Sequence, residues 1–186
     1  MTHGAKLCKD EMIESLITSK TRIKLLLKFF LNSKNSDYLR NLEAEFGESS
    51  NGIRVELNKF EKAGLLCTSA YGNKKIFTAN TKHPLFADIR SILLKYTGLD
   101  KIAEQVIGKL GDVEAVYLVG ELAKGLDSPI IDLVFVGDIN KTYLLTLTEK
   151  TEKLIHKKVR FEIFTNVEFS VQQNTILSQP HFNIIH

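Results

Sequence analysis

Residues 116–137 place the strongest limit on what this chain can fold into, because they combine two apolar runs with a glycine-containing loop. Val116–Val119 and Ile131–Val136 are rich in β-branched and aromatic residues, which is typical of buried strands. The loop between them contains three residues that favour turns: Gly120, Gly125 and Pro129. We therefore expect a strand, a glycine turn, a short helix or loop, and a second strand.

The composition indicates a globular protein with a real core. Of the 186 residues, 44% are apolar and 25% are charged. No apolar run approaches the ~20 residues that cross a membrane, and the N-terminus lacks the basic-then-apolar pattern of a signal peptide. We therefore expect a cytoplasmic protein without a membrane partner.

Metal-binding side chains show no useful spacing. Cys8 and Cys67 are too few for a disulfide framework and too far apart in sequence for a metal site. The histidines are scattered: His3, His83, His156, His181 and His186. We therefore expect no zinc site.

Charge is distributed unevenly along the chain. Residues 1–82 contain 14 Lys and Arg against 9 Asp and Glu, whereas residues 83–186 contain 11 against 13. A basic first part and a mildly acidic second part favour two separate functions. With the hydrophobic patterns below, this predicts a first domain over 15–82, a helical connector over 83–112 and a second domain over 113–186.

Three helices and a hairpin are predicted in the first domain. Apolar residues recur at helical spacing in three segments: 21–31, 37–46 and 50–63. Gly47 and Gly64 follow the second and third segments, where a left-handed residue ends a helix. The extended segments 65–70 and 75–79 then flank Tyr71-Gly72-Asn73-Lys74, which favours a hairpin with Gly-Asn at its tip.

The order of these elements resembles the winged helix of bacterial and archaeal regulators of the ArsR/MarR type, over residues 18–80. The resemblance implies that the third helix enters the major groove of double-stranded DNA. Four of its residues turn away from its apolar stripe and are expected to face DNA: Ser50, Asn51, Arg54 and Asn58. Arg54 is the best candidate for a base contact, while Lys74 and Lys75 on the hairpin would contact phosphates. Glu43 departs from the family pattern, which usually has a small residue where the two helices cross.

The predicted connector contains two amphipathic helices. Pro84 suits the first turn of a helix, and Gly98 separates two apolar stripes. The first stripe contains Leu85, Phe86, Ile89, Ile92, Leu93 and Tyr96, and the second contains Leu99, Ile102, Ala103, Val106, Ile107 and Leu110. One helix is expected to pack within its own domain while the other forms a homodimer that matches a two-fold operator. The alternative is that both are core helices.

Strands alternate with helices in the last part, which predicts a small α/β domain. A helix is expected over Tyr143–His156 and a third strand over Val159–Phe164, followed by a short helix and a loose end after Asn166. The inward residues of the first helix are expected to be Leu144, Leu147, Leu154 and Ile155.

This part resembles the minimal nucleotidyltransferase domain, which has the polymerase-beta-like fold. In that family the first strand ends in Gly-Ser, a short helix carries Ala-Arg-Gly or Ala-Lys-Gly, and the next strand carries Asp-x-Asp. The glycine lets the backbone approach a triphosphate, and the two carboxylates hold magnesium. Gly120 and Ala123-Lys124-Gly125 match this pattern, and Asp132 matches the second carboxylate.

Three departures remove parts of that site. Glu121 replaces the serine, Ile130 stands where the first carboxylate would be, and Pro129 precedes it. Glu162 on the neighbouring strand is the one evident substitute ligand. The residues of this degenerate nucleotide site are Gly120, Glu121, Lys124, Asp132 and Glu162. We expect no catalytic residue, no metal and no cofactor. A rearranged site built from the three carboxylates is the alternative, and it would require magnesium.

The whole chain is thus predicted to be an α+β winged helix followed by a small α/β nucleotidyltransferase-like domain. The expected function is that of a dimeric, DNA-binding transcriptional regulator whose second domain is a pseudoenzyme that senses a ligand or contacts a protein. Two alternatives remain. One is an active magnesium-dependent nucleotidyltransferase that holds its substrate with the winged helix. The other is an antitoxin-like pseudoenzyme that acts through a protein partner.

Overall fold

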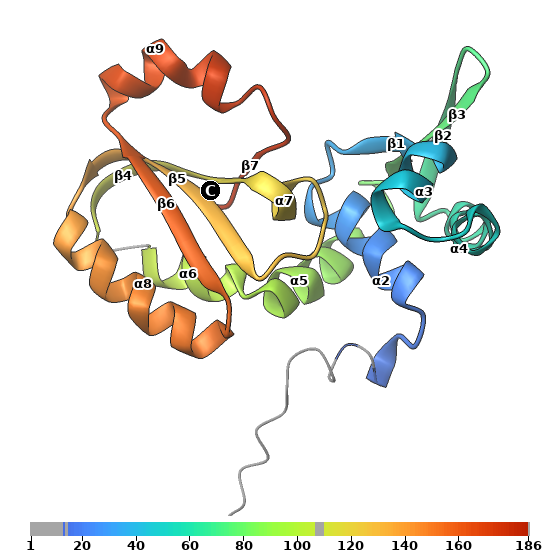
Figure 1. Cartoon of the computed structure of the whole chain (residues 1–186), viewed down its shortest axis with the longest axis horizontal. Coiled ribbons are helices and arrows are strands. Elements are labelled where there is room, and N and C mark those ends of the chain that lie inside the picture. The colour runs from blue at the N-terminus through green and yellow to red at the C-terminus, as the bar shows by residue number, and fades with distance from the viewer. Residues whose placement is uncertain (1–12, 14, 107–109, 186) are drawn as a thin grey trace, which may run out of the picture.

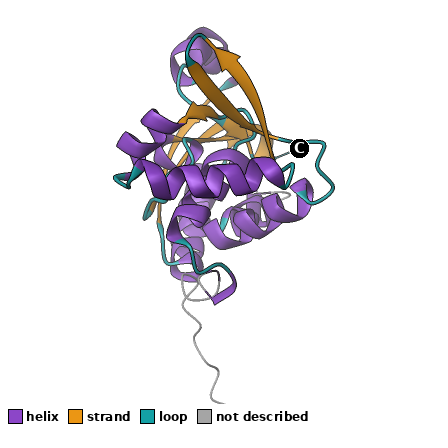
Figure 2. Cartoon of the chain, turned by 90° about the vertical axis from the view of Figure 1, so that its right-hand side faces the viewer, coloured by secondary structure: helices purple, strands orange, loops and turns teal. Residues whose placement is uncertain are grey.

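The computed structural model describes residues 13, 15–106 and 110–185, which form a mixed α and β structure with two separate sheets. In spatial order, the smaller sheet contains β1 (Ser36–Tyr38), β3 (Lys74–Ala79) and β2 (Leu66–Tyr71). The larger sheet contains β6 (Lys158–Phe164), β5 (Ile130–Ile139), β4 (Gly111–Val119) and β7 (Phe182–Asn183). Figure 1 places the two sheets at opposite ends of the molecule, and Figure 2 shows the same elements from a second direction. None of the described helices has the length and apolar character needed to span a membrane.

The helices beside the smaller sheet follow the predicted pattern closely. They are α2 (Lys20–Leu26), its π-helical continuation η1 (Leu27–Leu31), α3 (Leu39–Phe46) and α4 (Ser50–Lys62). Gly47 and Gly64 have φ angles of 63° and 73° at the ends of α3 and α4, as predicted. The side-chain oxygen of Ser49 accepts the N–H of Gly52 and so begins α4. The β2–β3 hairpin is also confirmed, since Tyr71 pairs with Lys74 around a two-residue turn.

The second helix was predicted to start about two residues too early. Asp37 belongs to β1 and pairs with Phe77 of β3, and α3 begins only at Leu39. The reason is a buried ion cluster. Lys28 Nζ lies 3.2 Å from Asp37 Oδ2 and 2.6 Å from Glu45 Oε2. A buried lysine needs carboxylate partners of this kind, and the ion pair with Lys28 holds Asp37 in an extended segment.

Both helices of the predicted connector, α5 (Phe86–Thr97) and α6 (Leu99–Val106), pack within the chain. The Phe86 ring contacts Phe30 of η1, with 5.7 Å between centroids, and Ile102 is buried against α8 (Lys141–Ile155). This arrangement fits the core-helix alternative. The predicted first stripe is wrong at Leu85 and Ile92, which are more than half exposed; Leu85 lies before the start of α5, and Ile92 lies within it on its exposed side. The predicted contact at Ile107 lies outside the described residues.

The larger sheet has α8 on one face and α9 (Asn166–Ile176) on the other (Figure 1). Pairing is antiparallel between β4 and β5 and parallel between β5 and β6. Leu154 of α8 was expected to point inward but is 53% exposed. The loose end predicted after α9 is also wrong, because Phe182 and Asn183 form β7 and pair with β4. Phe182 is buried there, which accounts for the pairing.

The two parts of the chain meet at the loop after the short helix α7 (Gly120–Ala123). Gly125 has a φ of 84°, and a Cβ at this position would overlap the backbone of Lys28 in η1. The side-chain amides of Asn32 and Asn35 donate to the Ala123 carbonyl over 3.1 and 3.2 Å. The close approach of the two backbones therefore requires glycine here.

Candidate functional site

A groove of about 600 Å³ lies between α3, α4 and the β2–β3 hairpin. Five of the residues predicted to contact DNA line it: Ser50, Arg54, Asn58, Lys74 and Lys75. Asn51 is exposed on α4 but does not line the groove. The structure thus gathers residues from two separate stretches of sequence onto one face.

The position of α4 is fixed by its apolar stripe and by one buried carboxylate. Ile53 and Leu57 are almost completely buried, and Arg54 and Val55, which follow Ile53, turn outward. Glu56, also buried, accepts the Nε–H of Arg22 on α2 over 2.8 Å and the ammonium of Lys59 over 2.9 Å. The hydrogen bond from Arg22, with a further one from Lys59, lowers the pKa of Glu56. Glu56 therefore anchors α4 against α2 while Arg54 points to solvent.

Two arginines in the groove carry free guanidinium groups. Arg54 on α4 and Arg40 on α3 are exposed, and within the described part of the chain no hydrogen bond or ion pair engages either side chain. Sequence reasoning missed Arg40. The available signal was its position on the polar side of a helix whose apolar stripe runs through Leu42 and Phe46.

The hairpin lysines are held in place by neighbours at the base of the groove. Lys74 Nζ lies 4.1 Å from the centroid of the Tyr38 ring, a cation–π contact. Lys75 Nζ lies 2.7 Å from Glu61 Oε2, and its hydrogen bond lowers the pKa of Glu61. Both lysines remain exposed, so they can contact a phosphate, but Lys75 must first leave Glu61.

Glu43 is the one carboxylate among the described residues that line this groove. It accepts the hydroxyl of Ser50 over 2.6 Å and so links α3 to the start of α4. The carboxylate of Glu43 therefore connects the two helices where they cross. Because Ser50 is engaged by Glu43, it is a weaker candidate for a DNA contact than Arg54.

A second hollow, of about 590 Å³, lies on the face of the larger sheet near α9. It brings together three residues of the predicted degenerate nucleotide site: Gly120, Asp132 and Glu162. Glu121 and Lys124 do not line it, and instead form an ion pair with each other over 2.8 Å. The predicted site is thus split into two groups.

Arg160 engages the carboxylate of Asp132, which is the group that would have to hold a metal at this site. Its Nε donates to Asp132 Oδ1 over 2.6 Å, and this hydrogen bond raises the pKa of Arg160. Sequence reasoning missed the pair because it depends on the register of β5 and β6, which sets Asp132 opposite Arg160.

The residues present do not fit magnesium. Ile130 offers no carboxylate, and Asp132 is engaged by a cation. Over the described ranges, no three His, Cys, Asp or Glu side chains come close enough together to hold a metal ion. No reaction step is therefore assigned to a metal here.

No protein-family profile and no curated protein sequence matches the chain. Among solved structures, reduced HlyU from Vibrio cholerae N16961 superposes with a TM-score of 0.33 and 11% identity, over 54% of this chain and 90% of that chain. A superposition of this quality supports neither a family assignment nor a function. The candidate sites rest on the geometry of this chain alone.

Proposed function

We propose that the chain is a DNA-binding transcriptional regulator whose recognition surface is formed by α3, α4 and the β2–β3 hairpin. The order of helix, short strand, two helices and hairpin is that of a winged helix. The observation that carries the proposal is the free guanidinium group of Arg54 on the exposed face of α4, beside the lysines of the hairpin. Together these groups offer both a base-reading side chain and phosphate contacts.

The chemistry of these side chains suits double-stranded DNA. A major groove is about 12 Å wide and admits one α-helix, and an arginine there can donate two hydrogen bonds to guanine. Lysines at the edge of the helix supply sequence-independent attraction to phosphates, which depends on salt. Arg54 would therefore determine specificity, while Lys74 and Lys75 would contribute to affinity on any duplex.

The second part of the chain is assigned no catalysis in this proposal. The support is the pairing of Asp132 with Arg160, which engages the one carboxylate that matches the nucleotidyltransferase pattern. A module that binds a small ligand or a protein remains compatible with the hollow around Gly120 and Glu162. Regulation of the DNA-binding part by this module is the function we assign to it.

The proposal is tested by an electrophoretic mobility shift on the DNA upstream of the protein's own gene. We expect the wild type to shift this fragment, and Arg54→Ala to weaken binding by roughly 10-fold or more, as for loss of a base contact. Lys153→Ala is the control, since Lys153 is exposed on α8, away from the groove. The proposal fails if no fragment is shifted, or if Arg54→Ala binds as tightly as Lys153→Ala.

A further inference from the structure

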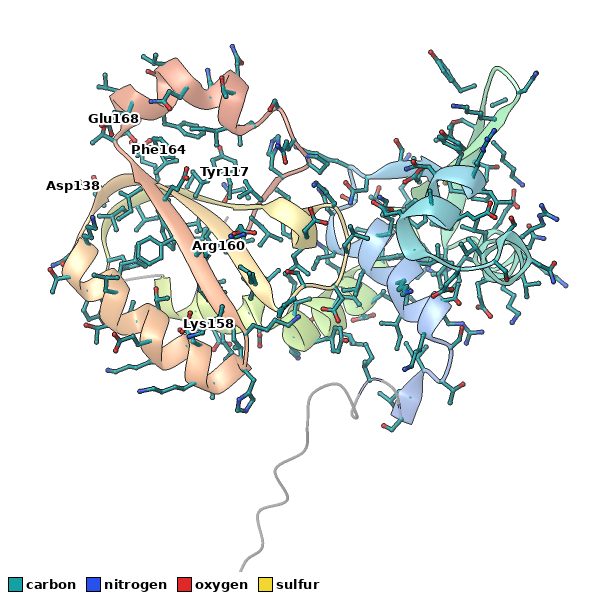
Figure 3. All side chains as sticks on the ribbon, in the orientation of Figure 1. Tyr117, Asp138, Lys158, Arg160, Phe164 and Glu168 are labelled. Carbon is teal, nitrogen blue, oxygen red and sulfur yellow. The ribbon has the colours of Figure 1, made fainter. Side chains whose placement is uncertain are left out.

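Within the described residues, one edge of the larger sheet carries a strand that has no other strand paired along its outer side. The sheet order places β6 at this edge, and β6 spans seven residues, whereas the strand at the opposite edge, β7, has two. Figure 3 labels Lys158, Arg160 and Phe164 along β6. Hollows of about 590 and 670 Å³ are both lined by residues of this strand, Phe161 and Glu162 among them. A long uncovered edge is a template for pairing with another strand.

The direction of the free backbone groups follows from one hydrogen bond. Lys158 N–H donates to the Pro129 carbonyl over 2.8 Å, on the side of β5. Backbone groups alternate along a strand, so the groups of Val159, Phe161 and Ile163 point away from β5. The Val159 N–H is already bound by Glu152 Oε1 over 2.9 Å. No described residue bonds the Val159 carbonyl or either backbone group of Phe161 and Ile163, so these groups are available to a new strand.

We propose that β6 pairs with β6 of a second copy of this chain, antiparallel and around a two-fold axis at Phe161. In this register the Phe161 N–H of each chain donates to the Phe161 carbonyl of the other chain. The Ile163 N–H of each chain donates to the Val159 carbonyl of the other. The interface is therefore isologous, as in most homodimers, and it extends the sheet across two chains.

Charge selects this register over its neighbours. A two-fold axis at Phe161 sets Arg160 opposite Glu162 of the second copy, twice per dimer. An axis at Val159 would set Arg160 opposite Lys158, and like charges directly opposite each other are unfavourable. An axis at Ile163 would set Glu162 opposite Phe164. An axis at Arg160 or at Glu162 would set that charged residue opposite its own copy, so the axis at Phe161 is the one register that sets Arg160 opposite a carboxylate of β6.

The two charged side chains are available for this contact. The Arg160 side chain is 68% exposed, and among the described residues Asp132 accepts a hydrogen bond from its Nε–H alone. The remaining guanidinium donors can bind a second carboxylate. Glu162 is exposed, and the described part of the chain gives it no hydrogen bond or ion pair. Directly opposite residues of the non-hydrogen-bonded kind have Cα atoms only about 4.5 Å apart, which suits an arginine–glutamate pair.

The test uses charge reversal and sedimentation equilibrium without DNA. The wild type is expected to dimerise, whereas Arg160→Glu and Glu162→Arg should each weaken dimerisation by roughly 10-fold or more, because two attractive pairs become repulsive. An equimolar mixture of the two variants should recover dimerisation as a heterodimer, since every cross-strand pair is again of opposite charge. Recovery in the mixture also shows that both variants are folded.

Three results would overturn the proposal. They are a wild type that stays monomeric at high concentration, single variants that dimerise as well as the wild type, and a mixture that does not recover. Lys153→Glu on α8 is the control for a change of net charge and should dimerise normally. Arg54→Ala should also dimerise normally, so this test is independent of the DNA-binding proposal.

Discussion

Arg160 on β6 donates its Nε–H to Oδ1 of Asp132 on β5 over 2.6 Å. Gly120 lies against the same carboxylate, so closely that a Cβ at Gly120 would overlap Asp132 Oδ2. Two features that resemble a nucleotide site, Gly120 and Asp132, are therefore part of an ion pair with Arg160. A carboxylate bonded to a guanidinium is poorly placed to bind a second cation.

Magnesium and a nucleoside triphosphate should consequently not bind at this hollow. In isothermal titration calorimetry we expect no heat of binding from ATP with magnesium, for the wild type or for Arg160→Ala. The variant frees Asp132, but position 130 is still an isoleucine, so the second carboxylate that would bind the metal is missing. Binding of ATP to the wild type that disappears when magnesium is chelated would contradict this reading.

Gly125→Ala should destabilise the protein strongly. The new methyl group would overlap the Lys28 backbone, and a φ of 84° is unfavourable for alanine. We expect a loss of roughly 3 kcal/mol in the free energy of unfolding, measured with urea. Gly47→Ala is the matched control, because its φ is 63° and no atom lies within 4 Å of the new Cβ. It should lose only about 1 kcal/mol from backbone strain; equal losses in the two variants would show that the contact with Lys28 is not tight.

Glu56→Gln should lower stability in a pH-dependent way. Because the folded state lowers the pKa of Glu56, the carboxylate contributes stability above its unfolded pKa of about 4.3 and loses that contribution as the pH falls through the folded pKa. The difference in unfolding free energy between wild type and variant should be about 1 kcal/mol or more at pH 7 and should shrink below about pH 4. Glu149→Gln, on the exposed side of α8, should show no such trend. A difference for Glu56→Gln that is the same at pH 3 and pH 7 would refute the ion pair with Arg22.

Glu61→Gln should tighten DNA binding. The substitution removes the carboxylate that pairs with Lys75 over 2.7 Å, so the lysine reaches a phosphate without first breaking an ion pair. We expect the affinity for a duplex to rise a few-fold in fluorescence anisotropy at low salt. The control is again Glu149→Gln, which lies far from the hairpin in sequence and outside the groove. Unchanged affinity in Glu61→Gln would mean that Lys75 does not contact DNA.

The helices and hairpin of the first part were predictable because their signals are local. Gly47 and Gly64 end helices by their own backbone preference, and Gly72-Asn73 forms its turn without distant partners. The short strand containing Asp37 was missed because that residue is held by Lys28, a buried lysine on a preceding helix that also pairs with Glu45. Tertiary contacts of this kind override local pattern.

In the second part of the chain, too, elements with local sequence signals were predicted and elements that depend on tertiary contacts were not. The strands and α8 follow from apolar runs and helical spacing, whereas β7 has two residues and exists because Phe182 is buried beside β4. The pairing of Asp132 with Arg160 depends on strand register, and a pattern read along one strand does not fix its register against another. Of the residues predicted for the nucleotide site, Gly120, Asp132 and Glu162 line one hollow, whereas Glu121 and Lys124 lie outside it.

The most direct measurement is the salt dependence of DNA binding by the wild type and by Lys74→Ala/Lys75→Ala. In fluorescence anisotropy on the fragment upstream of the protein's own gene, the logarithm of the association constant should fall linearly with the logarithm of salt concentration. Each phosphate contact contributes about 0.9 to that slope, so removal of both lysines should reduce its magnitude by about 2. A double variant with the slope and affinity of the wild type would contradict the assignment of this groove as the DNA-binding surface.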